Sequence, residues 1–417
     1  MASRFKEMFR IGAKRNPPSR NQSLDTAGSS MPIETDASGT VGEASMGSVA
    51  DFADCPFLGH RYYEPIRELY RQSFGYVYLA RHKETGQEVV IKLLERGPSV
   101  TTHVEQELLI HRKCTGHPNI IQLYEVFITQ HYLAIVLEYA SGGDLLDYVN
   151  AKGGLSEDEA RWFFQQLVLG ISYFHSIGVE NREIKLDNKL LTGDPSRPLV
   201  KVIDFTYSKS EQINSDPNSA LGSLPYTAPE VLSNSMKHGR HADVWSLGVA
   251  LYKLVTGYYP FERPEDGRDQ RSAVQSILSR IARVDYAIPP EFEKSPELRD
   301  LVCRMLVKEP ERRISTQQII SHPWFQKNLP SGFMETNQKV NPGLHQQSEA
   351  DICAVVREAQ LSTRHLDPEN IDVITDDVLN EEEVDDILEE LSLTSDGDYN
   401  SGRYNSTDIK YGRGYAL

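Results

Sequence analysis

Asn181-Arg-Glu-Ile-Lys-Leu-Asp-Asn188, followed by Val202-Ile-Asp-Phe-Thr206, is the part of this sequence that decides its fold. The first segment carries a carboxylate, Glu183, and ends on an amide. The second places Asp204, followed by a phenylalanine, sixteen residues after Asn188, in the position of a D-F-G motif. Because hard divalent cations prefer carboxylate and amide oxygens, we predict that Asn188 and Asp204 hold Mg²⁺.

A lysine and a glutamate precede this pair of segments in a matching order. Val89-Val-Ile-Lys92 has the composition of a strand, and Glu107 follows within a segment of helical spacing at 104–114. A lysine that ends a strand is often only a solvated side chain. In this ordered set, we predict instead that Lys92 contacts the α- and β-phosphates of a nucleotide and that Glu107 pairs with it.

Two later features favour the same fold without bearing on activity. Tyr226-Thr-Ala-Pro-Glu230 supplies an A-P-E element, and Arg313 is expected to be the buried partner of Glu230. Asp243 begins an apolar helical segment and is expected to brace the backbone of the 181–188 loop.

Local patterns predict a small β-rich lobe followed by a larger helical lobe, which is an α+β arrangement. Strands are expected at 66–71, 76–82, 88–94, 121–128 and 132–139. A helical period then begins after Ser156, whose Ser-Glu-Asp-Glu segment has the form of a capping box. Further helical segments are expected at 245–256 and 298–306, and the helical region extends to Trp324.

With these motifs in order, the stretch 60–325 resembles eukaryotic Ser/Thr protein kinases throughout. It looks closest to the plant-type osmotic-stress branch of the sucrose-non-fermenting-related kinases. That closer match is carried by Tyr207-Ser-Lys-Ser210, by Pro260-Phe-Glu-Arg-Pro-Glu-Asp266 and by the segment from His322 to Pro330. The resemblance implies a bilobal protein-kinase fold, ATP and Mg²⁺ as cofactors, and transfer of the γ-phosphate to protein hydroxyls in stress-type signalling.

The resemblance also assigns roles to individual residues. Glu183 would position the substrate hydroxyl and Lys185 would stabilise the transferring phosphoryl group, beside the two metal ligands. Together with Lys92 and Glu107, the residues expected to bind the nucleotide are Gly75, Val77, Val90, Glu138 and Leu190.

The glycine loop departs from the family pattern G-x-G-x-x-G-x-V. It reads Tyr70-Arg-Gln72-Ser-Phe-Gly75-Tyr-Val77, so only the third glycine and the valine remain. Glycine allows a backbone to approach a phosphate without a Cβ in the way, so Tyr70 and Gln72 are expected to loosen the phosphate cradle. Val90, where the pattern has a small alanine, is expected to narrow the adenine slot.

The catalytic loop and the D-F-G position also depart from the pattern. Asn181-Arg-Glu183 stands where H-R-D is expected, which moves the carboxylate outward by about 1 Å and can cost roughly 10²-fold in rate. Thr206 replaces the glycine of D-F-G, and its branched side chain is expected to restrict switching of this segment.

These departures leave two hypotheses. The first is a slow, ATP- and Mg²⁺-dependent protein Ser/Thr kinase, favoured by the presence of Lys92, Glu107, Asn188 and Asp204. The second is a pseudokinase that serves as a nucleotide-binding scaffold or allosteric partner, favoured by the altered loops.

Other positions suit protein substrates and an upstream kinase. Lys185 and Ser223 suit a Ser/Thr hydroxyl, and Arg182 is expected to receive a phosphate on Ser215 or Ser219, unless these serines are ordinary loop residues. Asp144 is expected to contact ribose or a basic substrate residue. The alternative is a solvated acid at the start of a helix.

The ends of the chain differ from the domain. Residues 1–58 are expected to form a disordered leader, with a basic targeting or membrane-surface helix at its start as the alternative. A helix at 345–362 resembles the regulatory helix of the same kinase branch, which implies packing of 350–359 on the small lobe. The acidic tail, 365–400, is expected either to dock as a helix or to remain solvated.

Charge and cysteine content restrict the remaining classes. The formal net charge of −16 argues against nucleic acid as a partner. No apolar run is long enough to span a bilayer. The four cysteines are far apart and favour a reduced, intracellular setting. Because the sequence shows no signal-peptide pattern, a cytoplasmic or nuclear location is the default expectation.

Overall fold

The structure is a computed structural model that describes residues 55–72, 75–194, 197–203, 209–210, 224–232, 239–266, 270–333 and 347–361. Several predictions concern residues outside these ranges. They are the predicted metal ligand Asp204, the substitution Thr206, the loop serines Ser215, Ser219 and Ser223, residues 1–54 of the leader, and the acidic tail. The prediction of a disordered leader is wrong for 55–58, because Cys55 and Phe57 are buried in an apolar cluster of the small lobe.

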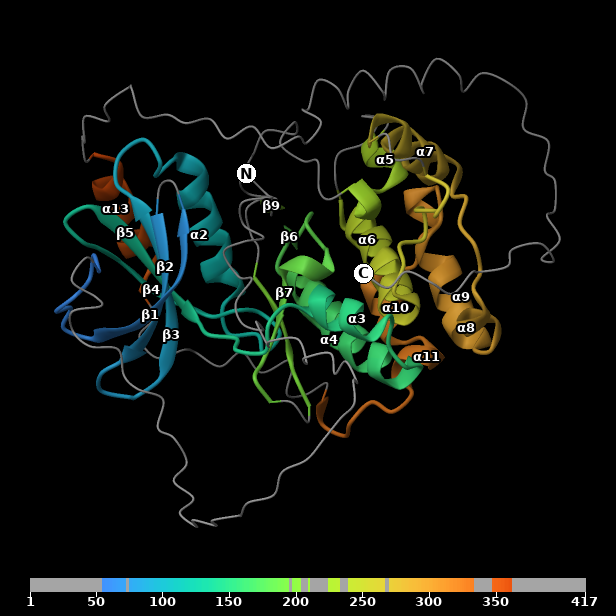
Figure 1. Cartoon of the computed structure of the whole chain (residues 1–417), viewed down its shortest axis with the longest axis horizontal. Helices are drawn as coiled ribbons and strands as arrows, with labels where there is room; N and C mark the ends of the chain where they lie inside the picture. The colour runs from blue at the N-terminus through green and yellow to red at the C-terminus, as the bar shows by residue number, and fades with distance from the viewer. Residues whose placement is uncertain are drawn as a thin grey trace, which may run out of the picture. The chain divides into compact units, whose positions relative to one another are not determined.

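The small lobe is built on a five-stranded antiparallel sheet with the strand order β1-β2-β3-β5-β4. One helix of this lobe, α2, lies beside the sheet (Figure 1). All five predicted strands and the predicted helix are present. Their bounds are β1 Tyr63–Gln72, β2 Gly75–His82, β3 Glu88–Glu95, α2 Thr102–Cys114, β4 Leu123–Ile128 and β5 Tyr132–Glu138.

The large lobe is mainly helical, as expected, and two short strand pairs lie at its start: β6 with β9, and β7 with β8. The strand bounds are β6 Val179–Glu180, β7 Lys189–Leu191, β8 Val200–Val202 and β9 Lys209–Ser210. The helices described are α3 Leu145–Lys152, α4 Glu157–Ser176, α5 Pro229–Leu232, α6 Arg240–Thr256, α7 Gln270–Arg283, α8 Pro290–Glu293, α9 Pro296–Met305, α10 Thr316–Ile320 and α11 Pro323–Gln326.

Helix α4 shows how the sequence pattern produces this lobe. The Ser156 side chain caps the helix by accepting a hydrogen bond from the amide of Glu159, as the sequence predicts. The predicted capping box is not completed, because the Glu159 carboxylate instead accepts hydrogen bonds from Tyr148 Oη at 2.5 Å and Lys152 Nζ at 2.6 Å. The apolar face that includes Phe163 and Phe164 is buried.

The two lobes are joined through β8 as well as through the chain. The amide of Ile121 donates to the Val202 carbonyl at 2.9 Å, and the Val202 amide donates to the Asn119 carbonyl at 2.9 Å. Lys201 Nζ also reaches Glu138 Oε1 at 2.6 Å. The predicted α+β, bilobal arrangement is therefore confirmed for the described residues.

A final helix, α13 (Glu349–Gln360), packs on the small lobe against α2 and β4. Ile352, Val356 and Ala359 are buried in the apolar cluster of that lobe. Just before α13, the Gln347 carboxamide exchanges two hydrogen bonds of 2.8 Å with the backbone of Val126. Because β4 is an edge strand, this side chain satisfies backbone groups that would otherwise lack a strand partner. The packing implied for 350–359 is confirmed.

Candidate active site

Asp243, near the start of α6, holds the backbone of the 181–188 loop through its carboxylate. One carboxylate oxygen accepts from the Arg182 amide at 2.8 Å, and the other accepts from the Asn181 amide at 3.0 Å and contacts His175 Nε2 at 2.8 Å. Burial opposes ionisation of Asp243, but these hydrogen bonds outweigh it and lower the pKa of the carboxyl below its ordinary value. The predicted bracing role of Asp243 is confirmed.

The same support fixes an uncommon backbone conformation. Arg182 has a φ of 62°, in the left-handed region that residues with a Cβ seldom adopt. Its guanidinium donates to Glu180 Oε2 from Nε at 3.2 Å and from Nη2 at 3.1 Å. Burial raises the pKa of Glu180, and the positive charge of Arg182 opposes that shift. The Arg182 guanidinium, which we expected to receive a phosphate on Ser215 or Ser219, is therefore already paired with the Glu180 carboxylate.

A second anchor of the large lobe lies further along the chain. Arg313 Nη1 and Nη2 form a bidentate pair with the two Glu230 carboxylate oxygens, at 2.5 and 2.6 Å. Both side chains are buried, so the predicted ion pair is confirmed.

The side chains predicted to take part in the reaction, those of Glu183, Lys185 and Asn188, belong to the loop that Asp243 holds. Glu183 Oε1 accepts from Lys185 Nζ, and both side chains are buried. Asn188 Nδ2 donates to the Glu183 backbone carbonyl at 3.0 Å, which fixes the orientation of the amide. The structure therefore brings together Glu183, Lys185 and Asn188. A pocket lies against Glu183 and Lys185, and residues 226–228 and the first turns of α6 form its other walls.

Sequence reasoning missed a residue in this cluster, Lys189. Its side chain is completely buried at the start of β7, opposite Val202 of β8. The ammonium donates to Asn188 Oδ1 and contacts the Glu183 carbonyl at 3.4 Å. A signal was available, because a lysine followed by two leucines in a strand that runs through the core is unusual and requires oxygen partners.

Gly75, the one glycine that remains in the glycine loop at 70–77, is required by the packing of the sheet. A Cβ on Gly75 would lie 2.0 Å from the backbone oxygen of Leu93 on β3, so any other residue would push these strands apart. Gln72 and Gly75 face each other in the β1–β2 register, and both strands thus continue to the tip of the hairpin. Close packing of β2 on β3 therefore requires Gly75, whatever is bound at the hairpin.

The side chains predicted to line the adenine slot form part of a closed apolar cluster. Val77, Val90 and Leu190 are only 1%, 2% and 4% exposed. Tyr70, which replaces the first glycine of the loop, packs on the same cluster. The side chains predicted to enclose the adenine thus belong to one apolar cluster, together with Tyr70.

The predicted phosphate-binding pair comes from the two elements that border this cluster. Lys92 is buried on β3, opposite Val77 of β2 and Ile135 of β5. Glu107 lies on α2 and is partly buried. Burial lowers the pKa of His111, one turn further along α2, to about 4, and the positive charge of Lys92 adds to this shift. Direct pairing of Lys92 with Glu107 stays a prediction.

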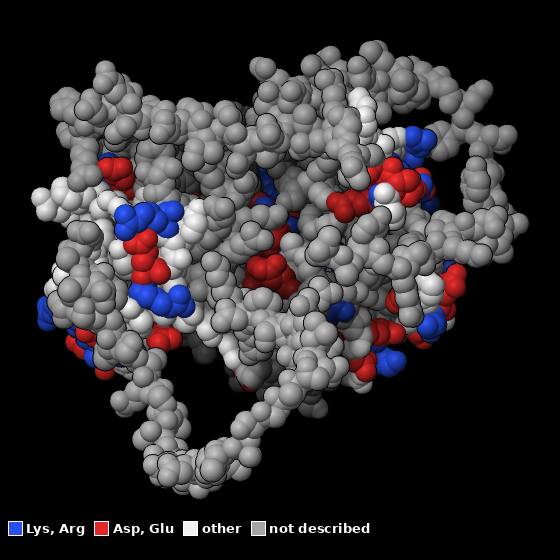
Figure 2. All heavy atoms as spheres, viewed as in Figure 1, with Lys and Arg blue, Asp and Glu red and all other residues white. Residues whose placement is uncertain are grey.

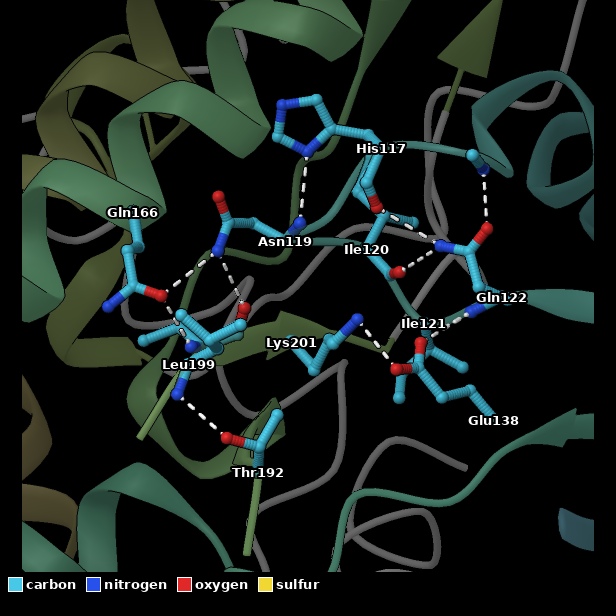
Figure 3. A network of polar contacts seen from close by, with 12 residues as sticks. His117, Asn119, Ile120, Ile121, Gln122, Glu138, Gln166, Thr192, Leu199 and Lys201 are labelled. Carbon is cyan, nitrogen blue, oxygen red and sulfur yellow. Dashed lines mark hydrogen bonds and ion pairs between the residues drawn. The ribbon is translucent and has the colours of Figure 1, made fainter. Parts of the chain in front are cut away.

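Glu138, predicted to contact the nucleotide, has its carboxylate engaged in a polar network between the lobes (Figure 3). Besides the ion pair with Lys201, its Oε2 accepts from the Gln122 amide at 3.1 Å. The Gln122 side chain in turn accepts from the Gly116 amide at 2.6 Å and donates to the Ile120 carbonyl at 2.6 Å. Any contact of Glu138 with a nucleotide would therefore come from its backbone.

Asp144 is the N-cap of α3, and its Oδ1 accepts from the Asp147 amide at 2.7 Å. Burial and the nearby charges of Asp147 and Asp187 raise the pKa of Asp144 to about 6, although the Asp147 amide opposes the shift. The helix-terminal alternative is thus correct in place, but the side chain is half-buried rather than solvated. Figure 2 shows acidic side chains gathered in a recess near the middle of one face of the molecule.

The fit of a divalent cation can be tested at the Asn188 half of the predicted metal site. Asn188 Oδ1, the oxygen that would bind the ion, accepts a hydrogen bond from the Lys189 ammonium. A cation that requires that oxygen at about 2 Å would meet a positive charge already beside it. The Asn188 half therefore does not fit a metal ion as the structure stands, whereas Asp204 lies outside the described residues.

Taken together, the two-lobed fold, the braced catalytic loop and the buried Glu230–Arg313 pair define a protein kinase. Residues 63–325 match the protein kinase domain family, and the chain belongs to that family.

The relatives agree with this assignment. The serine/threonine-protein kinase SAPK9 of Oryza sativa subsp. japonica is 43% identical over 303 residues, which cover 72% of this chain and 82% of the relative. SRK2H of Arabidopsis thaliana is 44% identical with the same coverage, and SRK2A of Physcomitrium patens is 42% identical over 72% of this chain and 86% of its own length. The predicted resemblance to the osmotic-stress branch of plant-type Ser/Thr kinases is confirmed.

Proposed function

We propose that this protein is a protein serine/threonine kinase that transfers the γ-phosphoryl group of ATP to protein hydroxyls in stress-type signalling. The observation that carries the proposal is the catalytic loop, where Glu183 and Lys185 are in contact and Asn188 is bonded to the Glu183 backbone. Relatives that are serine/threonine-protein kinases by name support it.

In this proposal, Glu183 accepts a hydrogen bond from the substrate hydroxyl and aligns it with the γ-phosphorus. Lys185, beside it, places positive charge near the transferring group, where charge is spread over the equatorial oxygens. Because that transition state is loose, alignment and charge contribute more than full proton removal. A carboxylate displaced by about one methylene therefore slows the reaction without abolishing it.

ATP and Mg²⁺ are the proposed cofactors, as protein kinases in general use ATP and a divalent metal ion. Lys92 would hold the phosphates, and Val77, Val90 and Leu190 would enclose the adenine. These three side chains belong to one apolar cluster, which suits contact with the apolar faces of an adenine ring.

The proposed protein substrate carries basic residues. Asp144 and Asp187 lie close enough for the charge of Asp187 to raise the pKa of Asp144. Such a pair of acids near the catalytic loop would attract a lysine or arginine beside the phosphorylated hydroxyl.

One incubation tests the proposed function. The purified full chain is mixed with Mg·ATP and a generic basic substrate protein, beside an Asp204→Ala control, and phosphate is detected by mass spectrometry. We expect incorporation by the parent and none by the control. No incorporation by the parent at long times, even after treatment with an upstream kinase, would overturn the proposal in favour of a nucleotide-binding scaffold.

Regulation by α13 is proposed because this helix packs on α2, which carries Glu107. The Ala359 carbonyl accepts from the Gly97 amide at 2.9 Å, and the Glu358 carbonyl accepts from Arg96 Nη2 at 3.1 Å, so the end of α13 is attached to the loop after β3. A charge at the buried position Val356 would detach the helix.

We expect Val356→Asp to lower the rate of phosphate incorporation about tenfold, since α2 would lose its support. Glu358→Asp, an exposed and conservative change in the same turn, is the matched control. An unchanged rate in Val356→Asp, with the helix shown to be detached by faster amide exchange, would contradict a regulatory role.

The remaining proposals concern partners and location. An upstream kinase acting at Ser215 or Ser219, protein signalling partners, and a cytoplasmic or nuclear location are proposed from the sequence alone. Among the described residues, no helix is long and apolar enough to cross a membrane.

A further inference from the structure

We propose that the Lys189 ammonium is a built-in cation that takes the place of a metal ion at Asn188, so that this protein binds its nucleotide with one divalent cation. The inference rests on the proposed function, because it concerns the same nucleotide site. It assigns a role to a residue that neither the sequence motifs nor the family pattern singles out.

The first step is the burial of Lys189. Its side chain is 0% exposed, and it lies in β7, whose neighbours Leu190 and Leu191 are also buried. A charged amine can remain in such a place only where oxygen atoms replace its water shell. The oxygens that contact it include Asn188 Oδ1 and the Glu183 carbonyl, and both belong to the catalytic loop.

The second step is the fixed orientation of the Asn188 amide. Its Nδ2 donates to the Glu183 carbonyl at 3.0 Å, so Oδ1 must point away from that carbonyl. Lys189 donates to this oxygen. The amide thus has no rotation available that would keep the loop bond and offer a different oxygen to a metal ion, because a carboxamide has one oxygen only.

The third step is charge. An ammonium and a divalent cation beside the same amide oxygen repel each other, and the ammonium is attached to the next residue of the chain. Its effective concentration at Asn188 is therefore far above that of any free ion. The positive charge of Lys189 would still offset part of the negative charge of the phosphates, as a second metal ion would do.

A direct count of bound metal tests the proposal. The full chain is saturated with ADP and titrated with Mn²⁺, and free Mn²⁺ is measured by electron paramagnetic resonance. We expect about one Mn²⁺ per ADP complex for the wild type and about two for Lys189→Met, which removes the ammonium but keeps a side chain of similar length.

A matched control separates this effect from the general loss of a buried lysine. Lys253 of α6 is likewise buried and donates to a backbone oxygen, that of Gly257 at 2.6 Å, outside the catalytic loop. Lys253→Met should keep the wild-type count of about one. A count of two for this control would overturn the assignment to Lys189.

If Lys189→Met does not fold, the number of Mn²⁺ ions bound to the wild-type ADP complex tests the inference by itself. Two Mn²⁺ ions bound to the wild-type ADP complex would overturn the inference and leave the kinase proposal intact. One ion bound to both the wild type and a folded Lys189→Met would also overturn it. If the wild type binds no ADP, with or without Mn²⁺, the proposed function and the inference both fail.

Discussion

The support of the large lobe, formed by Asp243 and the Glu230–Arg313 pair, and the reacting side of the catalytic loop differ in how closely they follow the kinase pattern. In the support, Asp243, Glu230 and Arg313 make the contacts that the sequence predicts. On the reacting side, an aspartate is replaced by Glu183 and a buried lysine stands at position 189.

The difference shows which constraints the fold itself imposes. A buried carboxylate that accepts two backbone amides cannot be replaced without leaving these groups unsatisfied, at a cost of about 1–3 kcal/mol each. Glu183, by contrast, can be one methylene longer because its carboxylate still finds Lys185. The support is thus fixed by stability, whereas the reacting side is fixed only by its chemistry.

The largest expected effect is a loss of stability in a variant that lacks the Glu230–Arg313 ion pair. Arg313→Ala would remove the guanidinium that pairs with the buried Glu230 carboxylate, and we expect a loss of about 3–5 kcal/mol in the free energy of unfolding. Urea denaturation measures this change. The neighbouring Arg312, which is 76% exposed, provides the control, and Arg312→Ala should change stability by no more than about 0.5 kcal/mol. Equal losses in the two variants would contradict the comparison.

Asp243→Asn tests whether the support determines the geometry of the reacting side. The amide keeps one acceptor oxygen but loses the charge held against His175 and two backbone amides, so the loop should shift. We expect phosphate incorporation to fall on the order of 10²-fold. Asp300, whose carboxylate also contacts a histidine, His322 at 3.0 Å, is the control because it is exposed. If Asp243→Asn and Asp300→Asn have the same rate, the bracing contacts have no catalytic consequence.

Glu183→Asp tests the reacting side itself. The shorter side chain restores the expected position of the carboxylate, and the rate of incorporation should rise about tenfold if its displacement limits the reaction. Glu180→Asp makes the same change in the neighbouring carboxylate that faces Arg182, and it should not raise the rate. No gain from Glu183→Asp would place the limitation on the glycine loop instead.

The smallest expected effect concerns Asp144, at the edge of the reacting side. Its pKa is about 6 in the folded protein and 3.8 ordinarily, so the folded state binds the proton more tightly. Its contribution to stability is therefore fully present below pH 3.8 and is lost as the pH rises through 6. Asparagine would retain the cap of α3 without the charge.

We thus expect Asp144→Asn to stabilise the protein at pH 7.5 by about 1 kcal/mol, a figure reduced for partial solvent exposure, and by almost nothing at pH 4. Urea denaturation at the two pH values measures the difference. Glu291→Gln, which removes an exposed carboxylate on α8, is the control. A gain that is equal at both pH values would show that the charge of Asp144 is not responsible.

How far the sequence reached can be judged on particular residues. The strands of the small lobe and the pairs made by Asp243 and Arg313 followed from periodicity and motif order, because a local pattern or a family spacing specifies each of them. The use of the Glu138 carboxylate could not be predicted. It depends on Lys201 of β8, which lies beside Glu138 only once the two lobes have packed.

What the sequence determined by itself was the kinase fold and the altered glycine and catalytic loops, since periodicity and spacing are properties of the chain. Only the tertiary structure decided that Val77, Val90 and Leu190 belong to one buried apolar cluster and that Lys189 donates to the Asn188 oxygen. Burial and the orientation of an amide depend on residues from several elements, and no local pattern contains that information. The physical reason is that solvation and charge act through space, whereas sequence motifs act along the chain.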